Sequence, residues 1–200
     1  MQIMAALETA GATPVANRDL HAIAYLANVL SPLWEVDPVE GSVLKDRKGP
    51  RSAALERELD ACVGLGLIIV DSIQPDDEYP NRLNATFRLN GAMARPVLRE
   101  ISALPDQAAV EKFLTELAFA FAEIVPERRD DAAKVDAAWS NPAVAQGRVV
   151  DFAEFVEQTR GNPAYNVAEA LQDYAPEGVI LTPAEKLVMY VRLLKRRAHG

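Results

Sequence analysis

Four basic residues stand close together in the first quarter of the chain, in a stretch rich in glycine and proline. They are Lys45, Arg47, Lys48 and Arg51, interrupted by Asp46. Lysine and arginine side chains bind carboxylates and phosphate groups. Loops often carry binding residues, because they lie on the surface of a protein. We therefore predict a loop over these four residues that contacts an acidic partner surface or a phosphate backbone.

A second basic cluster lies near the end of the chain. It contains Arg192, Lys195, Arg196 and Arg197. Cations in the last turn of a helix are favoured by the helix dipole, so this cluster is explained without a ligand. The first cluster has no such explanation and is the stronger prediction of a binding site.

Residues that commonly perform catalysis are scarce. The chain has one cysteine, Cys62, and two histidines, His21 and His199. Cys62 falls on the apolar stripe of a predicted helix, which indicates a small buried side chain. His21 has no second histidine three or four residues away, so we expect a packing or surface role for it and no metal site. The sequence therefore predicts no catalytic residue, no metal, no cofactor and no enzyme activity.

Composition and charge restrict the partners and the compartment. The chain has 200 residues and a net charge of −8, which argues against general nucleic-acid binding because phosphate affinity comes mostly from lysine and arginine. No apolar run reaches the length of a membrane span, and the N-terminal segment lacks the basic region of a signal peptide. Together with the single cysteine, this pattern predicts a cytoplasmic protein.

The N-terminal half shows the pattern of a winged helix, in which two helices precede a two-stranded hairpin. Asn17 is the predicted N-cap of one helix, Ser31-Pro32 ends it, and Ser52 is the predicted N-cap of the next. The predicted elements are a helix over 17–30, a loop over 32–50 with a short strand at 43–44, a helix over 52–63, and strands at 67–70 and 85–89. We expect a winged-helix-like domain over 1–90.

The C-terminal half predicts helices and no further strand. Its predicted helices cover 94–104, 107–125, 128–139, 149–159, 163–174 and 183–197. The helix over 107–125 is apolar on almost all sides, so Phe113, Leu117 and Phe121 are predicted to form an interface with a partner. The helix over 128–139 is predicted to be polar and exposed. The fold class is thus mainly α (α+β), with a helical domain over 91–200.

The charge of the predicted winged helix disfavours a role in reading DNA. The helix that would enter the major groove, 51–65, carries two arginines against three acidic residues, a net charge of −1. The hairpin connection, 71–82, carries four acidic residues against Arg82, a net charge of −3. Contact with phosphate requires positive charge, so this surface favours a protein partner.

Three segments resemble a known family. They are 20–34 (LHAIAYLANVLSPLW), 43–50 (VLKDRKGP) and 55–68 (LERELDACVGLGLI). Over residues 13–90 the chain resembles the middle component of bacterial three-component ABC-type systems, which pair an SMC-type ATPase with a small adaptor and an effector-like protein. This resemblance implies a bridging role in an anti-phage or DNA-surveillance complex, with the ATPase and the effector as protein partners. It assigns no catalytic residue.

The stretch 47–50 (RKGP) also resembles the Panacea domain of antitoxin-like proteins. Three hypotheses therefore stay open. The chain is a non-enzymatic adaptor subunit of an SMC-like ATPase complex, a winged-helix transcription regulator that binds DNA, or an antitoxin that neutralises a toxin. The absence of common catalytic residues and the acidic hairpin favour the adaptor.

Overall fold

The computed structural model describes residues 1–75, 83–142, 147–152 and 161–199. It confirms the predicted class: the chain is mainly helical, with small antiparallel sheets. In the N-terminal half the elements are α1 (Gln2–Thr9), β1 (Val15–Ala16), α2 (Asn17–Leu30), the 3-10 helix η1 (Ser31–Trp34), β2 (Ser42–Asp46), β3 (Gly49–Arg51), α3 (Ala53–Gly64), β4 (Ile68–Pro75) and β5 (Leu83–Leu89).

Helices and one further strand make up the rest of the described regular structure. They are α4 (Gly91–Ser102), α5 (Gln107–Ala122), the 3-10 helix η2 (Pro126–Arg128), α6 (Arg129–Lys134), β6 (Val149–Asp151), α8 (Pro163–Ala170), the 3-10 helix η4 (Leu171–Tyr174) and α9 (Pro183–His199). Within the described ranges, no helix has both the length and the apolar character that crossing a membrane would require.

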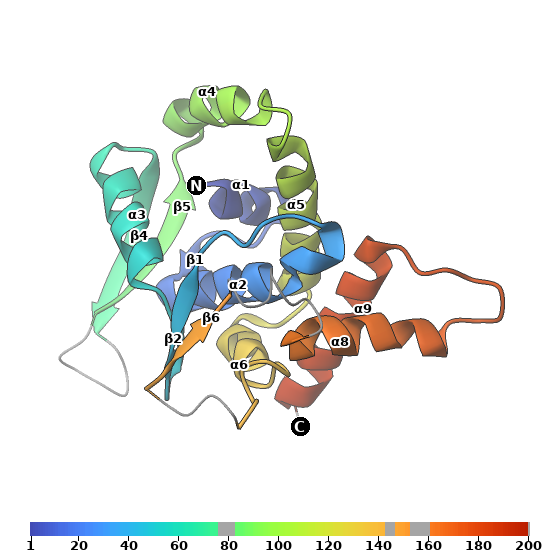
Figure 1. Cartoon of the computed structure of the whole chain (residues 1–200). Coiled ribbons are helices and arrows are strands. Elements are labelled where there is room, and N and C mark those ends of the chain that lie inside the picture. Colours follow the sequence, from blue (N-terminus) through green and yellow to red (C-terminus); the bar gives the residue numbers. More distant parts are fainter. Residues whose placement is uncertain (76–82, 143–146, 153–160, 200) are drawn as a thin grey trace.

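Helix α2 lies at the centre of the molecule, with helices and strands around it (Figure 1). Every residue from Asp19 to Leu30 is buried, which is unusual for a helix that also contains polar residues. Helix α5 lies between α1 and α9, and α6 packs against α2. One hydrophobic core thus draws side chains from both sides of residue 90, while the division into domains 1–90 and 91–200 stays a prediction.

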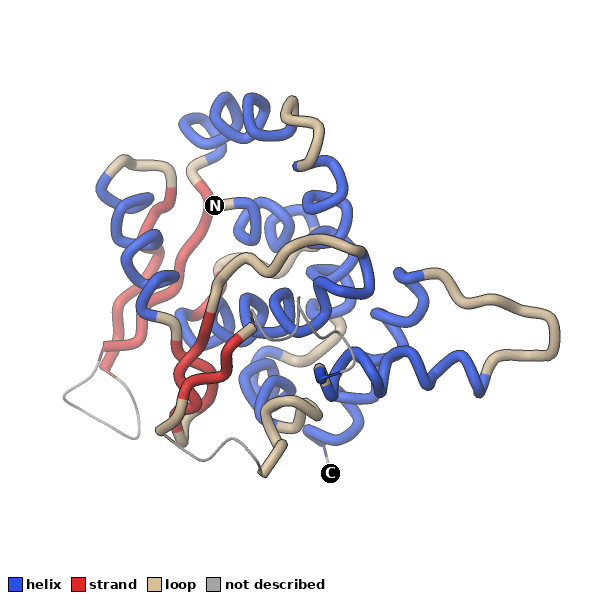
Figure 2. The backbone as a smooth tube through the Cα atoms, viewed as in Figure 1, coloured by secondary structure: helices blue, strands red, loops and turns tan. Residues whose placement is uncertain are grey.

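The strands form two small antiparallel sheets, seen in Figure 2. In one sheet β5 lies between β1 and β4, and the β4–β5 hairpin places Ile68 opposite Leu89 and Pro75 opposite Leu83. In the other, β2 lies between β3 and β6. Strands β2 and β3 of the second sheet lie between α2 and α3 in the chain, so the hairpin that carries the first basic cluster connects the two predicted winged-helix helices, and β6 joins the sheet from residues 149–151.

Several local predictions are confirmed by the structure. The Ser52 hydroxyl accepts a hydrogen bond from the Leu55 N–H and caps α3, as the sequence predicts. Helix α2 covers the predicted range 17–30, β4 includes residues 68–70 of the predicted strand 67–70, and β5 contains the predicted strand 85–89. The winged-helix assignment of these elements stays a prediction.

Other local predictions are wrong. Ala16, and not Asn17, is the N-cap residue of α2, and the Asn17 side chain makes no capping bond. The segment over 32–50 is more regular than predicted, because β2 and β3 pair as a hairpin. Residues 149–151 form strand β6 instead of the start of a helix, since they pair with β2. Residues 153–160 of that predicted helix lie outside the described residues.

The segment 128–139 is neither one helix nor exposed. It begins at the last residue of η2 and continues through the short helix α6 and a turn, and Asp136 and Trp139 are buried against the core. The polar residues that suggested exposure make contacts inside the protein instead. Helix α5 also turns its apolar residues inward, because Phe113, Leu117 and Phe121 are each at most 1% exposed. The partner interface predicted for these three therefore has no exposed surface in this structure.

Candidate functional site

The basic cluster is built on the β2–β3 hairpin. Asp46 pairs with Gly49, so Arg47 and Lys48 form the two-residue turn between the strands. Gly49 has a φ of +125°, a conformation that side-chain-bearing residues rarely adopt, which explains glycine at this position. The turn holds Arg47 exposed at the tip, and it makes no hydrogen bond or ion pair with any described residue.

Lys45 belongs to the core face of the hairpin. It is 5% exposed, its Nζ donates to the Asn141 carbonyl at 3.1 Å, and it lies 5.8 Å from the centre of the Trp139 ring. Alternation of side chains along β2 places Val43 and Lys45 on this inner face. Lys45 therefore acts inside the protein, and the structure separates it from the other three predicted residues.

Lys48 and Arg51 line a hollow of about 140 Å³ beside the hairpin. Its wall is supplied by α2 (Asn17, Arg18, His21), by the hairpin (Asp46, Lys48, Gly49, Pro50, Arg51), by α3 (Glu56) and by β5 (Leu83, Asn84). The structure thus joins two of the predicted basic residues to residues of α2. We name this hollow the α2–hairpin pocket.

Arg51 and Glu56 form an ion pair at the edge of this pocket. The Arg51 Nε and Nη2 groups both donate to Glu56 Oε1, at 3.0 and 2.9 Å. Both side chains are more than one third exposed, so solvent weakens this pair and it contributes little stability. Its effect is to hold the Arg51 guanidinium across the start of α3.

His21 has a fixed orientation in the pocket wall. The Ser52 N–H donates to Nδ1 at 3.2 Å, so the neutral ring carries its proton on Nε2. His21 is 6% exposed, and burial lowers the pKa of its imidazole, although nearby Glu56 acts in the opposite direction. The ring is therefore neutral at pH 7 and presents Nε2–H as a hydrogen-bond donor.

Two buried polar atoms of the pocket residues lack hydrogen-bond partners among the described residues. They are Nε2 of His21 and Oδ1 of Asn17. Glu56 Oε1 lies 3.6 Å from His21 Nε2, too far for a hydrogen bond, and already accepts from Arg51. Asn17 and His21 are four residues apart on α2 and thus share one face of the helix. Unpaired buried polar atoms are uncommon in proteins, so the pair is a notable feature of this wall.

The described residues of the pocket supply hydrogen-bonding groups and charged groups of both signs. Arg18 adds a guanidinium with a 55% exposed side chain, and His21 and Asn17 add one donor and one acceptor. Asn17 and Arg18 were not predicted as site residues from the sequence, and His21 was predicted to have a packing or surface role. The spacing of Asn17 and His21 on one predicted helix was the available signal, but only the fold brings the hairpin to them.

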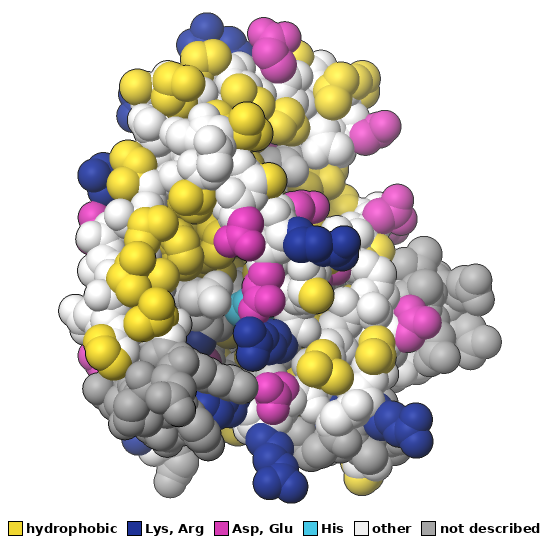
Figure 3. All heavy atoms as spheres, turned by 90° about the vertical axis from the view of Figure 1, so that its left-hand side faces the viewer, with side chains coloured by type: hydrophobic (Ala, Val, Ile, Leu, Met, Phe, Trp, Pro, Cys, Tyr) yellow, Lys and Arg dark blue, Asp and Glu magenta, His cyan; other side chains and the backbone are white. Residues whose placement is uncertain are grey.

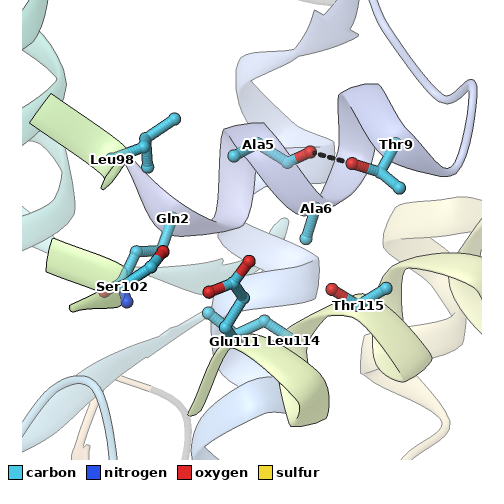
Figure 4. Close-up of a pocket in the computed structure, with 9 residues that line it drawn as sticks. All are labelled: Gln2, Ala5, Ala6, Thr9, Leu98, Ser102, Glu111, Leu114 and Thr115. Carbon is cyan, nitrogen blue, oxygen red and sulfur yellow. Dashed lines mark hydrogen bonds between the residues drawn. The ribbon is translucent and has the colours of Figure 1, made fainter. Parts of the chain in front are cut away.

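A second hollow, of about 100 Å³, lies between α1, α4 and α5 (Figure 4). Ala5, Ala6 and Leu114 contribute hydrocarbon surface, and Glu111 is its one ionisable residue. The Thr9 hydroxyl beside it is occupied, since it donates to the Ala5 carbonyl at 2.9 Å. This hollow has no second charged group to act with Glu111, so it is the weaker candidate.

The C-terminal basic cluster lies on the last turns of α9. Arg192 donates to both carboxylate oxygens of Glu123, at 3.1 and 2.9 Å, and links α9 to the end of α5. The Lys195 carbonyl lies 2.6 Å from His199 Nδ1. These contacts agree with the structural role expected for the cluster from the helix dipole.

Comparison with known proteins identifies no relative of this chain. No family model matches the chain, and neither the curated proteins nor the solved structures contain a match.

Proposed function

We propose that this chain is a non-enzymatic adaptor subunit that bridges an SMC-like ABC ATPase and an effector in a bacterial anti-phage or DNA-surveillance complex. In this proposal α2, α3 and the β4–β5 hairpin form a winged helix, since they follow one another as two helices and a hairpin. The fold serves as a protein clamp in the cytoplasm. The resemblance of residues 13–90 to the middle components of such systems supports the same role.

The observation that carries the proposal is the surface of α3 and the β4–β5 hairpin. Leu65, Ile73 and Leu83 are 68%, 60% and 70% exposed there. Figure 3 shows hydrophobic side chains gathered in a band on this side of the molecule, next to acidic and basic ones. Exposed apolar side chains that lie together are typical of protein contacts and are not used to bind phosphate.

The described arginines of this surface are engaged within the chain. Arg88 on β5 donates to Asp71 on β4 at 3.0 Å, and Arg57 on α3 donates to the Ala53 carbonyl at 3.1 Å. Glu58 and Asp60 are exposed on α3. A helix that enters the DNA major groove would place these carboxylates near phosphates, which is unfavourable. This distribution favours a protein partner over DNA.

Co-purification tests the proposal. The chain is expressed with its neighbouring genes, and we expect a stable complex with an SMC-like ATPase. Arg47→Glu should weaken that complex without changing the melting temperature, because Arg47 is exposed at the hairpin tip. Arg99→Glu, an exposed reversal on α4, is the matched control. A chain that binds its own promoter DNA with a steep salt dependence, and no ATPase, would overturn the adaptor in favour of a transcription regulator.

A further inference from the structure

Two of the buried polar atoms that lack a hydrogen-bond partner among the described residues belong to the wall of the α2–hairpin pocket. His21 Nε2–H needs an acceptor and Asn17 Oδ1 needs a donor, and both atoms are buried. A buried polar group without a partner is unfavourable, so a ligand that forms hydrogen bonds with both atoms is stabilised on binding. The two atoms thus specify a ligand with an acceptor and a donor close together.

The charged residues around the pocket specify the charge of that ligand. Arg18, Lys48 and Arg51 are opposed by Asp46 and Glu56, so three positive and two negative groups leave a formal charge of +1. This balance suits a group with a single negative charge. A terminal phosphate, with nearly two charges, would be repelled by the two carboxylates.

Two monoanionic groups remain, a carboxylate and a phosphodiester, and the Asn17 oxygen distinguishes them. A phosphodiester offers acceptors only and leaves Oδ1 unpaired. An acidic residue within a peptide offers carboxylate oxygens together with backbone N–H donors. The acceptor and the donor that the pocket requires are therefore both present in a single aspartate or glutamate residue of a protein.

We propose that the α2–hairpin pocket binds an acidic side chain of a partner protein. The carboxylate accepts hydrogen bonds from His21 Nε2–H and the Arg18 guanidinium, and a neighbouring peptide N–H donates to Asn17 Oδ1. This inference rests on the proposed adaptor function and names the kind of segment that the partner contributes.

The test uses the full-length chain labelled with ¹⁵N and the capped peptide acetyl-Gly-Asp-Gly-amide as the probe. Long-range ¹H–¹⁵N spectra report the ring nitrogens of His21, and His199, at the far end of α9, serves as the internal control. We expect a saturable shift of His21 Nε2 with a dissociation constant of about 1 mM, which corresponds to about 4 kcal/mol of binding energy. Acetyl-Gly-Asn-Gly-amide, which lacks the charge, should bind about 5-fold more weakly.

Substitutions test whether the shift of the His21 Nε2 signal depends on the proposed contacts with the peptide. Arg18→Gln and Asn17→Ala change residues outside the core and should each weaken binding about 3-fold or more, because each removes one hydrogen bond to the peptide. Arg57→Gln, on the outer side of α3, is the matched control and should bind as the wild type does. Equal weakening by Arg57→Gln would show a general charge effect and overturn the site.

Two further outcomes would overturn the inference. One is a His21 signal that does not saturate with the aspartate peptide, as expected where only water occupies the pocket. The other is a saturable shift with single-stranded oligothymidylate and none with the peptide, which would indicate a phosphodiester site. If the peptide does not bind but the chain still forms the ATPase complex, the proposed peptide site is rejected and the adaptor function is not. Peptide binding without any ATPase complex rejects the adaptor function alone.

Discussion

Polar groups of helix α2 lie in two regions of the protein that differ in hydrogen bonding. Farther along the helix, the Tyr25 hydroxyl reaches Asp136, which is fully buried and accepts four hydrogen bonds. Its donors are Tyr25 at 2.6 Å, Tyr190 at 2.5 Å, and the backbone N–H groups of Ala138 and Trp139 at 2.9 and 3.1 Å. In the first two turns of the same helix, Asn17, Asp19 and His21 each have a buried polar atom without a hydrogen-bond partner among the described residues.

The two regions differ in the role that their polar groups play. The Asp136 region holds structural elements together, and the N-terminal turns of α2 border a candidate binding site. Asp136 joins α2 to α9 and to the turn after α6, and every buried oxygen is paired, as expected for a group that holds elements together. The N-terminal turns of α2 border the α2–hairpin pocket, where pairing is incomplete. Evolution of a purely structural helix would be expected to pair or remove such atoms. The unpaired atoms of Asn17 and His21 lie in the wall of a charged pocket, which favours a binding role there, whereas Asp19 is not among the residues that line it.

The largest expected effect comes from breaking the complete network. Asp136→Ala leaves two buried tyrosine hydroxyls and two backbone N–H groups without their acceptor. We expect the free energy of unfolding to fall by about 3–5 kcal/mol, in the range for loss of a buried charged partner. Urea denaturation of the purified chain measures the change. A loss below about 1 kcal/mol would mean that the network is not the structural centre that its geometry suggests.

Asp19 gives the opposite pH behaviour to a paired carboxylate. Its nearest cations, Arg18 and Arg129, lie 3.8 Å away, and burial raises the pKa of Asp19 to about 6 from its ordinary value of 3.8. The native state therefore holds the proton more tightly than the unfolded chain does. The contribution of Asp19 to stability is largest below pH 4 and is lost as the pH rises through 6.

Asp19→Asn removes this dependence. The difference in unfolding free energy between the variant and the wild type should move in favour of the variant by about 1–3 kcal/mol from pH 4 to pH 7.5. Urea melts of both proteins across this range provide the measurement. The comparison is a difference between two pH values, so any constant cost of the substitution cancels. Parallel stability curves for the two proteins would contradict an elevated pKa at Asp19.

A matched pair of mild substitutions sharpens the comparison between the regions. Tyr190→Phe removes one donor from Asp136 and should cost about 1–2 kcal/mol, since a buried carboxylate oxygen loses its partner. Asn17→Ala removes an atom that is already unpaired and should change stability by less than about 0.5 kcal/mol. Thermal melts of both variants test the pair. Equal losses would show that the Asn17 oxygen is paired in solution by the protein itself.

The outlines of the helices could be predicted from the sequence, because apolar spacing and the Ser52 cap act within a few residues. The site could not be predicted in the same way. In the sequence Lys45 cannot be distinguished from its basic neighbours, but in the structure its side chain lies over the Trp139 ring. Residues 149–151 form a strand because they pair with β2, which is more than a hundred residues away in the chain. The acidic residues in 128–139 suggested exposure, but Asp136 is buried with partners from α2 and α9. Such outcomes depend on long-range contacts that no local pattern contains.

The smallest effect, and the most specific, concerns the protonation of His21. Burial lowers the pKa of His21 below its ordinary value of 6.5, so the unfolded chain binds this proton more readily than the native state does. The stability that the neutral ring provides is present above pH 6.5 and is lost as the pH falls through the folded pKa. In ¹⁵N spectra recorded through an acid titration, His21 should stay in the neutral Nε2–H form at pH 7 and titrate at a lower pH than a free histidine. Because Nδ1 accepts from the Ser52 N–H, the opposite tautomer at pH 7 would contradict both the hydrogen bond and the donor on which the pocket depends.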